Sequence, residues 1–300
     1  MTDLLRIRRV RRSFEKMMAD LEKFLLDELT CPSCYNYMCP PINQCQKGHN
    51  VCNECFPRVN ICPKCRAPKS NTSRNYALEA IHGRLLIPCK YQYLGCDYIC
   101  LGETIKNHQK YCKFTKQECP FSSYDNCQWK DSIIKLKTHL LKKHSHNFYQ
   151  KDKQKFISQH FRNISNYHYI FAVIYVFDNY FRLTWDINEG TGMTRWAVYF
   201  MGSPEDAKKY SYKLEFTKGY QITYNTVPLT FKSVCDPKSD KGSSKFGDHN
   251  CFYIHKTLLD KYCIENGDLH YRVSIYALQE EEEYTSDIAL LFVEGSKNFP

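Results

Sequence analysis

The chain has 300 residues, of which 43% are hydrophobic and 15% aromatic, so it can bury a substantial core and form about two domains. It contains no apolar run of about 18 residues, and its first residues are rich in arginine, which argues against a membrane-spanning helix and a secretory leader. We therefore expect an intracellular protein in the cytoplasm, with the nucleus as a further compartment. The formal charge is +10, and its excess lies in residues 31–150, which would attract acidic partners.

The first segment has the pattern of a helix. Residues 4–12 read LLRIRRVRR and carry five arginines. Seven apolar side chains then recur at helical spacing: Phe14, Met17, Met18, Leu21, Phe24, Leu25 and Leu29. We expect an amphipathic basic helix over residues 1–30 that packs on the module that follows. Nuclear import or a membrane surface are the alternatives.

The cysteines divide the chain into two chemically different halves. Fourteen of the 17 lie between Cys31 and Cys127. In an intracellular chain the reducing environment favours metal ligation over disulfides. Residues 31–146 are therefore expected to be organised by metal, and the second half by an ordinary hydrophobic core.

Residues 31–66 carry seven cysteines and one histidine at the spacings of zinc ligands. Two-residue spacers let a tight turn bring two sulfurs to one tetrahedral ion. Only two residues separate His49 from Cys52, so four consecutive ligands cannot easily serve one ion and the sites should interleave. The expected sets are Cys31, Cys34, Cys52 and Cys55 for zinc one, and Cys45, His49, Cys62 and Cys65 for zinc two.

This order of ligands, with the histidine in fourth place, resembles the RING finger. In RING ubiquitin ligases the proline of the last ligand pair helps to dock the ubiquitin-conjugating enzyme, a place held here by Pro63. An arginine after the last ligand can bridge that enzyme and its ubiquitin, which assigns this role to Arg66; a solvated charge is the alternative. Ser33 stands where many RING fingers carry an aliphatic docking residue, so it departs from the pattern.

After a linker over residues 67–88, residues 89–146 repeat a second ligand pattern. An identical gap of 11 residues precedes the first histidine of each copy, which marks an internal repeat of a hairpin followed by a helix. Cys100 and His146 compete as ligands, and the spacing favours Cys96 over Cys100. The expected sets are Cys89, Cys96, His108 and Cys112 for zinc three, and Cys119, Cys127, His139 and His144 for zinc four.

Three stretches make the resemblance specific: CPSCYNYMCPPINQCQKGHNVCNEC, RNYALEAI and PCKYQYLGCDY. With the paired fingers, they closely resemble the Seven-in-absentia (SINA/SIAH) family of ubiquitin ligases over about residues 28–279. The resemblance implies that residues 150–279 form a TRAF-like β-sandwich that binds substrates and makes a homodimer. Two further departures are Cys39, an extra thiol, and one additional residue between Cys119 and Cys127.

The second half supports that expectation from its own pattern. Aromatic and β-branched runs alternate with turn signals, as in a sandwich of short strands, over residues 169–177, 180–187, 194–202, 210–217, 220–231 and 268–278. Ser203 and Pro204 predict the start of a short helix, and residues 236–249 a mobile loop. Residues 280–300 form an acidic and apolar C-terminal extension. The expected fold class is multidomain α+β, with a RING and two zinc fingers followed by an all-β TRAF-like sandwich.

These features together predict a RING-type ubiquitin ligase with four structural zinc ions per chain. It would recruit a ubiquitin-conjugating enzyme carrying ubiquitin and promote transfer to substrate lysines, directing substrates to the proteasome. It would supply no nucleophile of its own and act by positioning the thioester. The alternatives are a catalytically weak adaptor and a zinc-finger protein that binds nucleic acid.

Overall fold

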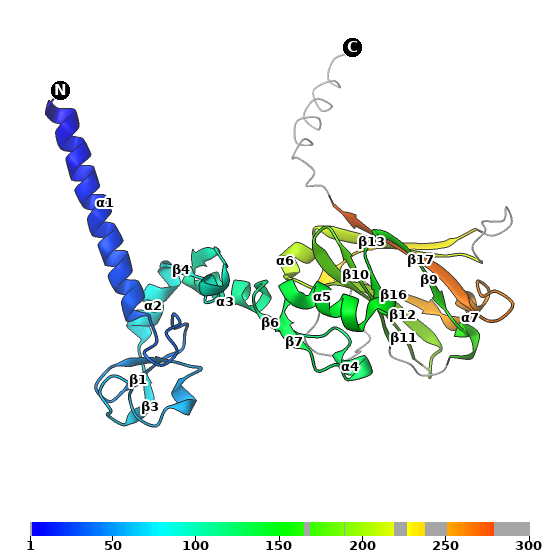
Figure 1. Cartoon of the computed structure of the whole chain (residues 1–300), viewed down its shortest axis with the longest axis horizontal. Helices are drawn as coiled ribbons and strands as arrows, with labels where there is room; N and C mark the ends of the chain where they lie inside the picture. The colour runs from blue at the N-terminus through cyan, green and yellow to red at the C-terminus, as the bar shows by residue number, and fades with distance from the viewer. Residues whose placement is uncertain (1, 165–168, 189, 219–226, 238–250, 279–300) are drawn as a thin grey trace, which may run out of the picture. The chain divides into compact units, whose positions relative to one another are not determined.

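The computed structural model describes residues 2–164, 169–188, 190–218, 227–237 and 251–278 (Figure 1). The chain divides into two compact units. The first unit comprises Met1–Gln117 with Asp131–Ile134, and the second comprises Glu118–Lys130 with Lys135–Pro300. In the parts of the chain that the structure describes, no helix is long and apolar enough to cross a membrane.

The first unit begins with one continuous helix, α1 (Thr2–Glu28) (Figure 1). The predicted helix is present, and it packs on the first zinc module through its last turn only. Its side chains from Val10 to Phe24 are exposed, and it enters the core of the unit only at Leu26, followed by Leu29 just beyond its end. That core is small and is filled by Leu29, Met38, Ile42 and their neighbours, so it covers only the last turn of the helix.

A three-stranded sheet follows α1. Strand β1 (Ile42–Cys45) lies in its centre and pairs with β2 (Asn50–Cys52) and with β3 (Lys69–Arg74), both antiparallel. The short 3-10 turn η1 (Phe56–Arg58) lies between β2 and β3 in the chain. Residues 67–88, expected as a linker, thus contribute a strand to this sheet.

Helix α2 (Tyr76–Arg84) also lies within those residues and is fastened to the same sheet. Its N-cap is Asn75, whose side chain accepts a hydrogen bond from the Leu78 amide at 3.0 Å. Glu79 accepts a hydrogen bond from the Ile42 amide at 2.8 Å and forms an ion pair with Arg74. That ion pair, together with the backbone hydrogen bond, lowers the pKa of the Glu79 carboxyl.

The rest of the first unit is built from short elements around helix α3. These are β4 (Leu86–Pro88), η2 (Gln92–Leu94), β5 (Ile99–Leu101), α3 (Gly102–Tyr111) and β6 (Lys116–Glu118). Strands β4 and β5 pair antiparallel. At the start of α3, Gly102 lies against α2 so closely that an added Cβ would come within 2.0 Å of the His82 carbonyl oxygen. Any larger residue there would force the two helices apart.

His82 is itself an unusual core residue, because its side chain is only 1% exposed and both ring nitrogens lack a hydrogen-bond partner. Burial lowers the pKa of this imidazole, the positive charge of Lys106 lowers it further, and Glu79 opposes the shift. The folded protein therefore holds His82 neutral.

We predict an acid sensitivity that originates at His82. Because its pKa is lower in the folded state, the unfolded state binds a proton first, and stability falls as the pH drops below the unfolded value of about 6.5. Between pH 7.5 and pH 5.5 the wild type should lose more stability than His82→Phe, by at most about 1.4 kcal/mol, measured by urea unfolding of the first unit. His82→Phe keeps every zinc-ligand histidine, so equal losses in the two proteins would contradict the prediction.

The second unit begins with short elements that precede the sandwich. They are α4 (Ser122–Asp125), α5 (Ile133–Lys143), η3 (Ser145–Asn147) and β8 (Phe148–Tyr149). Strand β7 (Lys130–Ser132) and the first two residues of α5 lie at the boundary, because Asp131–Ile134 belong to the first unit. Helix α5 buries Leu136 and Leu140 on one side, whereas Leu141 is exposed. Strand β8 then pairs parallel with the first long strand of the sandwich.

Two sheets form the sandwich (Figure 1). The first has the order β15-β12-β11-β10-β8, with β16 also paired to β12, and the second has the order β14-β13-β17-β9. The strands of the first sheet are β10 (Tyr169–Val176), β11 (Asn179–Asn188), β12 (Met193–Phe200), β15 (Asp236–Pro237) and β16 (Phe252–His255). Those of the second are β9 (Lys153–Ser158), β13 (Tyr210–Phe216), β14 (Leu229–Val234) and β17 (Leu269–Ala277). Three short elements join them: η4 (Phe161–Asn163), α6 (Pro204–Ala207) and α7 (Lys256–Asp260).

The core of the sandwich lies between the inner faces of the two sheets. Trp196 on β12 stacks on Trp185 of β11, with ring centroids 5.2 Å apart. From the second sheet, Phe216 and Tyr271 approach Trp196, each with its ring centroid 5.0 Å away. The aromatic side chains of this half therefore form its core.

Most expected strands match the structure within two residues, and the Ser203 hydroxyl caps α6 by accepting from the Asp206 amide at 3.1 Å. The strand expected at 220–231 is an exception. The structure places a strand at β14, and residues 219–226 lie outside the described part of the chain. The first two residues of the expected loop at 236–249 form the short strand β15, and residues 238–249 and 280–300 lie outside the described part of the chain.

Candidate metal centres

Cysteine and histidine side chains meet in four clusters of four residues. In each cluster the possible ligand atoms all lie within 4.8 Å of one another. The structure brings together Cys31, Cys34, Cys52 and Cys55; Cys45, His49, Cys62 and Cys65; Cys89, Cys96, His108 and Cys112; and Cys119, Cys127, His139 and His144. These are the four sets expected from the spacing.

The distances inside the clusters fit a tetrahedral zinc ion. With Zn–S of about 2.3 Å and Zn–N of about 2.0 Å, a tetrahedron places two sulfurs about 3.8 Å apart and a sulfur and a nitrogen about 3.5 Å apart. The structure has 3.8 Å between the sulfurs of Cys34 and Cys52, and 3.7 Å from the Cys45 sulfur to Nδ1 of His49. In the third cluster the Cys89 and Cys112 sulfurs are also 3.8 Å apart.

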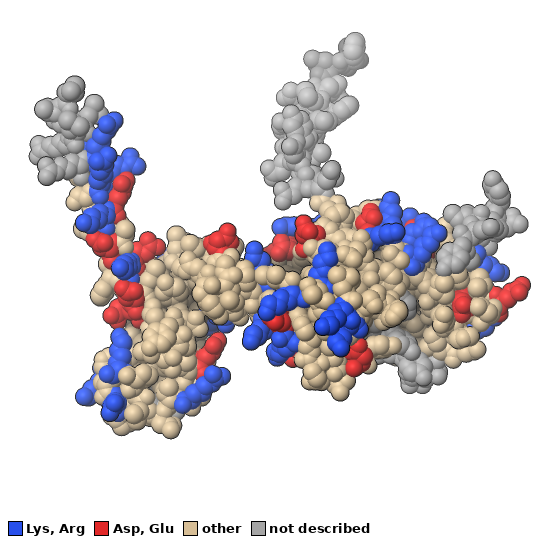
Figure 2. All heavy atoms as spheres, in the orientation of Figure 1, with Lys and Arg blue, Asp and Glu red and all other residues tan. Residues whose placement is uncertain are grey.

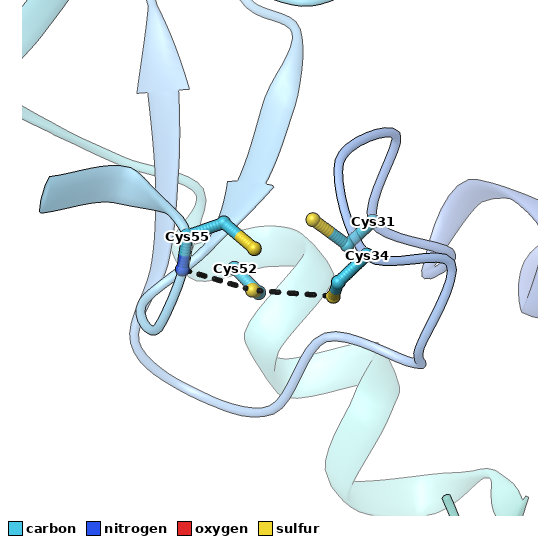
Figure 3. Close-up of side chains that lie close together, drawn as sticks. All are labelled: Cys31, Cys34, Cys52 and Cys55. Atoms are coloured by element: carbon cyan, nitrogen blue, oxygen red, sulfur yellow. Dashed lines mark hydrogen bonds between the residues drawn. The ribbon is translucent and has the colours of Figure 1, made fainter. Parts of the chain in front are cut away.

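In the first cluster, four sulfurs from two separate chain segments point toward one another (Figure 3). Cys31 and Cys34 come from the loop after α1, whereas Cys52 ends β2 and Cys55 precedes η1. The Cys55 amide donates to the Cys52 sulfur at 3.4 Å. An ion bound here would join the end of α1 to the sheet.

Residues 31–65 contain three C-x2-C turns, and those at Cys31–Cys34 and Cys62–Cys65 share one backbone geometry. In the first turn the Tyr35 amide donates to the Cys31 carbonyl, and in the second the Arg66 amide donates to the Cys62 carbonyl, each at 2.9 Å. Tyr35 and Arg66 therefore occupy equivalent positions. Both adopt the left-handed backbone conformation, with φ of 60° and 57°. The hydrogen-bonded turn therefore fixes the backbone position from which the Arg66 side chain extends.

In the two fingers the structure selects among competing ligands. Cys96 lies 3.4 Å from Nε2 of His108, whereas Cys100 lies on β5 and packs against the core of the first unit. His144 lies 3.4 Å from the Cys119 sulfur, whereas His146 belongs to η3, outside the cluster. Chain spacing alone had favoured Cys96. The gap between the last two ligands is four residues in the second finger and three in the first.

Sequence reasoning missed the aromatic side chains that position the finger histidines. His108 stacks on Tyr98 with centroids 4.0 Å apart, and His139 stacks on Trp129 with centroids 4.7 Å apart. Tyr98 and Trp129 each follow the second cysteine of their finger by two residues, so the repeat contained this signal.

His144 is held in place by a carboxylate. Its Nδ1 lies 2.9 Å from a carboxylate oxygen of Asp125, while Nε2 faces the cluster. Histidines that bind metal commonly donate their other ring nitrogen to a carboxylate, which fixes the tautomer and the ring orientation. Asp125 is thus a positioning residue for the fourth cluster.

The surface residues expected to meet a conjugating enzyme are exposed. They are Ser33, Pro63 and Arg66. Two large apolar side chains of the same turns are exposed as well and were not singled out in the sequence: Tyr35 is 80% exposed and Ile61 is 52% exposed. Tyr35 follows Ser33 by two residues, and Ile61 precedes Pro63 by two.

Of the five cysteines outside the clusters, Cys39, Cys100 and Cys251 are half-buried, and Cys235 and Cys263 are buried. Cys39 lies beside a pocket of about 120 Å³ that is also lined by Lys90 and Lys106. Burial raises the pKa of the Cys39 thiol, although the two lysines act in the opposite direction. Cys235 and Cys263 are buried in the sandwich core, and burial raises the pKa of their thiols to about 12 and about 11.

Comparison with known proteins identifies the same three parts of the chain. Residues 31–65 match the family described as "E3 ubiquitin-protein ligase sina/sinah, RING finger". Residues 80–158 match "Sina, zinc finger", and residues 174–274 match "Sina, TRAF-like domain". The E3 ubiquitin-protein ligase SINAT2 of Arabidopsis thaliana is 32% identical over 213 residues, which cover 68% of this chain and 68% of that protein.

The chain belongs to the Seven-in-absentia (SINA/SIAH) family. Other SINA/SIAH proteins show similar likeness. The E3 ubiquitin-protein ligase siah2 of Xenopus laevis is 29% identical over 250 residues, covering 82% of this chain and 77% of its own length. Human E3 ubiquitin-protein ligase SIAH2 is 38% identical over 115 residues, or 38% of this chain and 35% of that protein.

Family membership and the geometry of the ligand clusters both indicate zinc. The SINA/SIAH RING and zinc-finger matches cover the four clusters, and the ligand sets consist of cysteine and histidine at tetrahedral spacing. The chain accordingly has four structural zinc sites. A RING followed by zinc fingers and a TRAF-like sandwich confirms the expected fold class.

Proposed function

We infer that this SINA/SIAH chain is a RING-type ubiquitin ligase, which brings a ubiquitin-conjugating enzyme, its ubiquitin and a protein substrate together. The observation that carries this conclusion is the interleaved pair of clusters between Cys31 and Cys65, within a chain matched by family proteins named as ubiquitin ligases. Zinc supplies structure and holds the two turns rigid. No open coordination position is needed for water.

The chemistry of transfer belongs to the conjugating enzyme. In this chain the RING thiols are engaged as ligands, so they do not attack the thioester. The contribution of the ligase is to hold the charged enzyme so that a substrate lysine meets it in an effectively intramolecular reaction. The exposed side chains of the C-x2-C turns at Cys31–Cys34 and Cys62–Cys65 can provide that surface.

At the level of residues we propose specific roles. Pro63 and Ser33 dock the conjugating enzyme, and Arg66 bridges that enzyme and its ubiquitin. The four clusters described above are the zinc-ligand sets. The proposed parts are the helix at 1–30, the RING at 31–66, the segment at 67–88 that adds β3 and α2 to the RING sheet, the double finger at 89–146, the sandwich at 150–279 and the extension at 280–300.

We further propose that the sandwich binds the substrates and forms a homodimer. Its support is the match of residues 174–274 to the TRAF-like domain of the family. Two copies would bring two RING fingers to one substrate and raise the effective concentration. Substrates ubiquitinated in the cytoplasm, or in the nucleus, would pass to the proteasome.

An autoubiquitination assay across several conjugating enzymes tests the proposed activity. Ubiquitin ladders that depend on this chain are the expected result. Ser33, exposed where many RING fingers carry an aliphatic residue, favours one competing function, a catalytically weak adaptor. Absence of ladders with every enzyme, while the zinc content stays intact, would favour the adaptor.

We predict that Arg66→Ala slows discharge of a charged conjugating enzyme without weakening the fold. The side chain is exposed and lies outside the ligand sets, so the free energy of unfolding should change by less than about 0.5 kcal/mol. A guanidinium can donate to carbonyls on two partners at once, and an ammonium does this poorly, so Arg66→Lys should recover only part of the rate. Single-turnover discharge of a preloaded enzyme measures both effects.

The matched control is Lys47→Ala, which removes another exposed positive charge from the same module. It should discharge the enzyme at the wild-type rate. If Arg66→Ala also matched the wild type, Arg66 would be a solvated charge and the bridging role would be wrong.

A further inference from the structure

Helix α1 carries an exposed apolar stripe. Six side chains are separated alternately by three and four residues and are between 48 and 65% exposed: Ile7, Val10, Phe14, Met17, Leu21 and Phe24. This spacing has the period of 3.5 residues that defines the seam of a coiled coil. The core of the first unit takes in α1 only from Leu26 onward, so it leaves this seam uncovered.

The charges of α1 are divided between its two halves. Residues 2–14 contain five arginines and one aspartate, whereas residues 15–28 contain five carboxylates and two lysines. Figure 2 shows basic side chains gathered towards the N-terminal end of α1 and acidic ones nearer its C-terminal end. Two such helices side by side in the same direction would place arginine against arginine. In opposite directions, each basic half meets an acidic half.

The spacing of the seam residues reads the same from either end of the helix, which fits antiparallel pairing. One antiparallel register brings together residues whose numbers add up to 31. In this register Ile7 lies opposite Phe24 of the second copy. The same register sets Val10 opposite Leu21 and Phe14 opposite Met17. Every seam residue then faces another seam residue. A coiled coil formed this way closes after two chains and leaves no seam residue without a partner.

We propose that α1 pairs with α1 of a second copy of this chain as an antiparallel coiled coil. The 27 residues of the helix span about 40 Å, and the RING follows α1 directly. Antiparallel pairing therefore holds the two RING fingers at opposite ends of the coil. This contact is separate from the proposed sandwich dimer and does not depend on ligase activity.

A membrane surface is the competing occupant, and the charges disfavour it. A helix that lies on an anionic bilayer usually carries basic side chains along its whole polar face. Here the second half holds Glu15, Asp20, Glu22, Asp27 and Glu28. An anionic surface would repel that half, whereas the basic half of a second copy would attract it.

A photo-crosslinking side chain placed at Val10 of the full chain tests both the pairing and its direction. Antiparallel pairing predicts a crosslink to a peptide around Leu21 of another copy. A crosslink around Val10 of the other copy would overturn the proposed direction. Absence of a crosslink between copies at micromolar concentration, or Phe14-dependent binding to phosphatidylserine vesicles in its place, would overturn the pairing itself.

Matched substitutions give a second test in the same full chain. Phe14→Glu, on the seam, should reduce the crosslink at least about tenfold. Ala19→Glu, on the opposite side of the helix, should leave it unchanged. Mixing Phe14→Glu with Met17→Lys should restore it, because Glu and Lys then face each other in the antiparallel register only. No recovery in the mixture, or equal losses from Phe14→Glu and Ala19→Glu, would contradict the proposal.

Discussion

Replacing Cys62 by serine is expected to remove zinc from the RING, unfold that module and abolish ubiquitin transfer together. Cys62 is buried and its sulfur lies 3.8 Å from Nδ1 of His49, within the second cluster. Structural zinc contributes an apparent binding energy of roughly 10–16 kcal/mol to small zinc-dependent folds, far more than a module of this size gains from its core. Native mass spectrometry should find at most three zinc ions on the variant and four on the wild type.

Cys39→Ser is the control for this substitution. It makes the same chemical change in the same module, at a cysteine outside the four clusters. It should retain four zinc ions and the wild-type rate of transfer. The sandwich should also melt at an unchanged temperature in Cys62→Ser, since its core contains no residue of the RING. Four zinc ions on Cys62→Ser would overturn the assignment of the second set.

The second large effect is expected in the sandwich, at the ion pair between Asp186 and Arg195. The two residues lie opposite each other on β11 and β12, and they are only 6% and 5% exposed. Asp186→Ala leaves a buried guanidinium without this carboxylate, which typically costs about 3–5 kcal/mol. Chemical unfolding of the second unit should show that loss. Discharge of the conjugating enzyme, which depends on the RING, should stay at the wild-type rate.

A double variant separates two quantities: the free-energy cost of leaving one buried charge unpaired, and the net contribution of the ion pair to stability. Asp186→Leu with Arg195→Met replaces both charges by apolar groups and should recover most of the stability. Lys209→Met removes the exposed pair between Lys209 and Asp206 and should cost less than about 1 kcal/mol. A loss of that small size for Asp186→Ala would show that the buried pair contributes little.

The sequence was most informative where chemistry fixes the spacing. A tetrahedral ion requires ligands at short, repeated offsets, so the four ligand sets could be written down before the structure was known. The buried strands could also be predicted, because short runs of aromatic and β-branched residues such as TRWAVYF are typical of strands. Both signals are local in the chain.

Contacts between distant segments were harder to predict. The polar residues of β3 look like a loop, but their backbone completes the sheet beside β1. Periodicity showed that α1 has an apolar face, yet it carried no information about what covers that face. The stacking of Tyr98 on His108 was recoverable in principle, because Trp129 repeats its offset.

The most direct test of the central claim is one turnover of a ubiquitin-charged conjugating enzyme onto free lysine, with and without this chain. Free lysine removes any dependence on the unknown substrate, so the measurement isolates the RING. The account predicts that the zinc-loaded wild type accelerates discharge at least about tenfold with one or more enzymes, and that Cys62→Ser does not. Equal rates with and without the zinc-loaded chain, across a broad panel of conjugating enzymes, would contradict it.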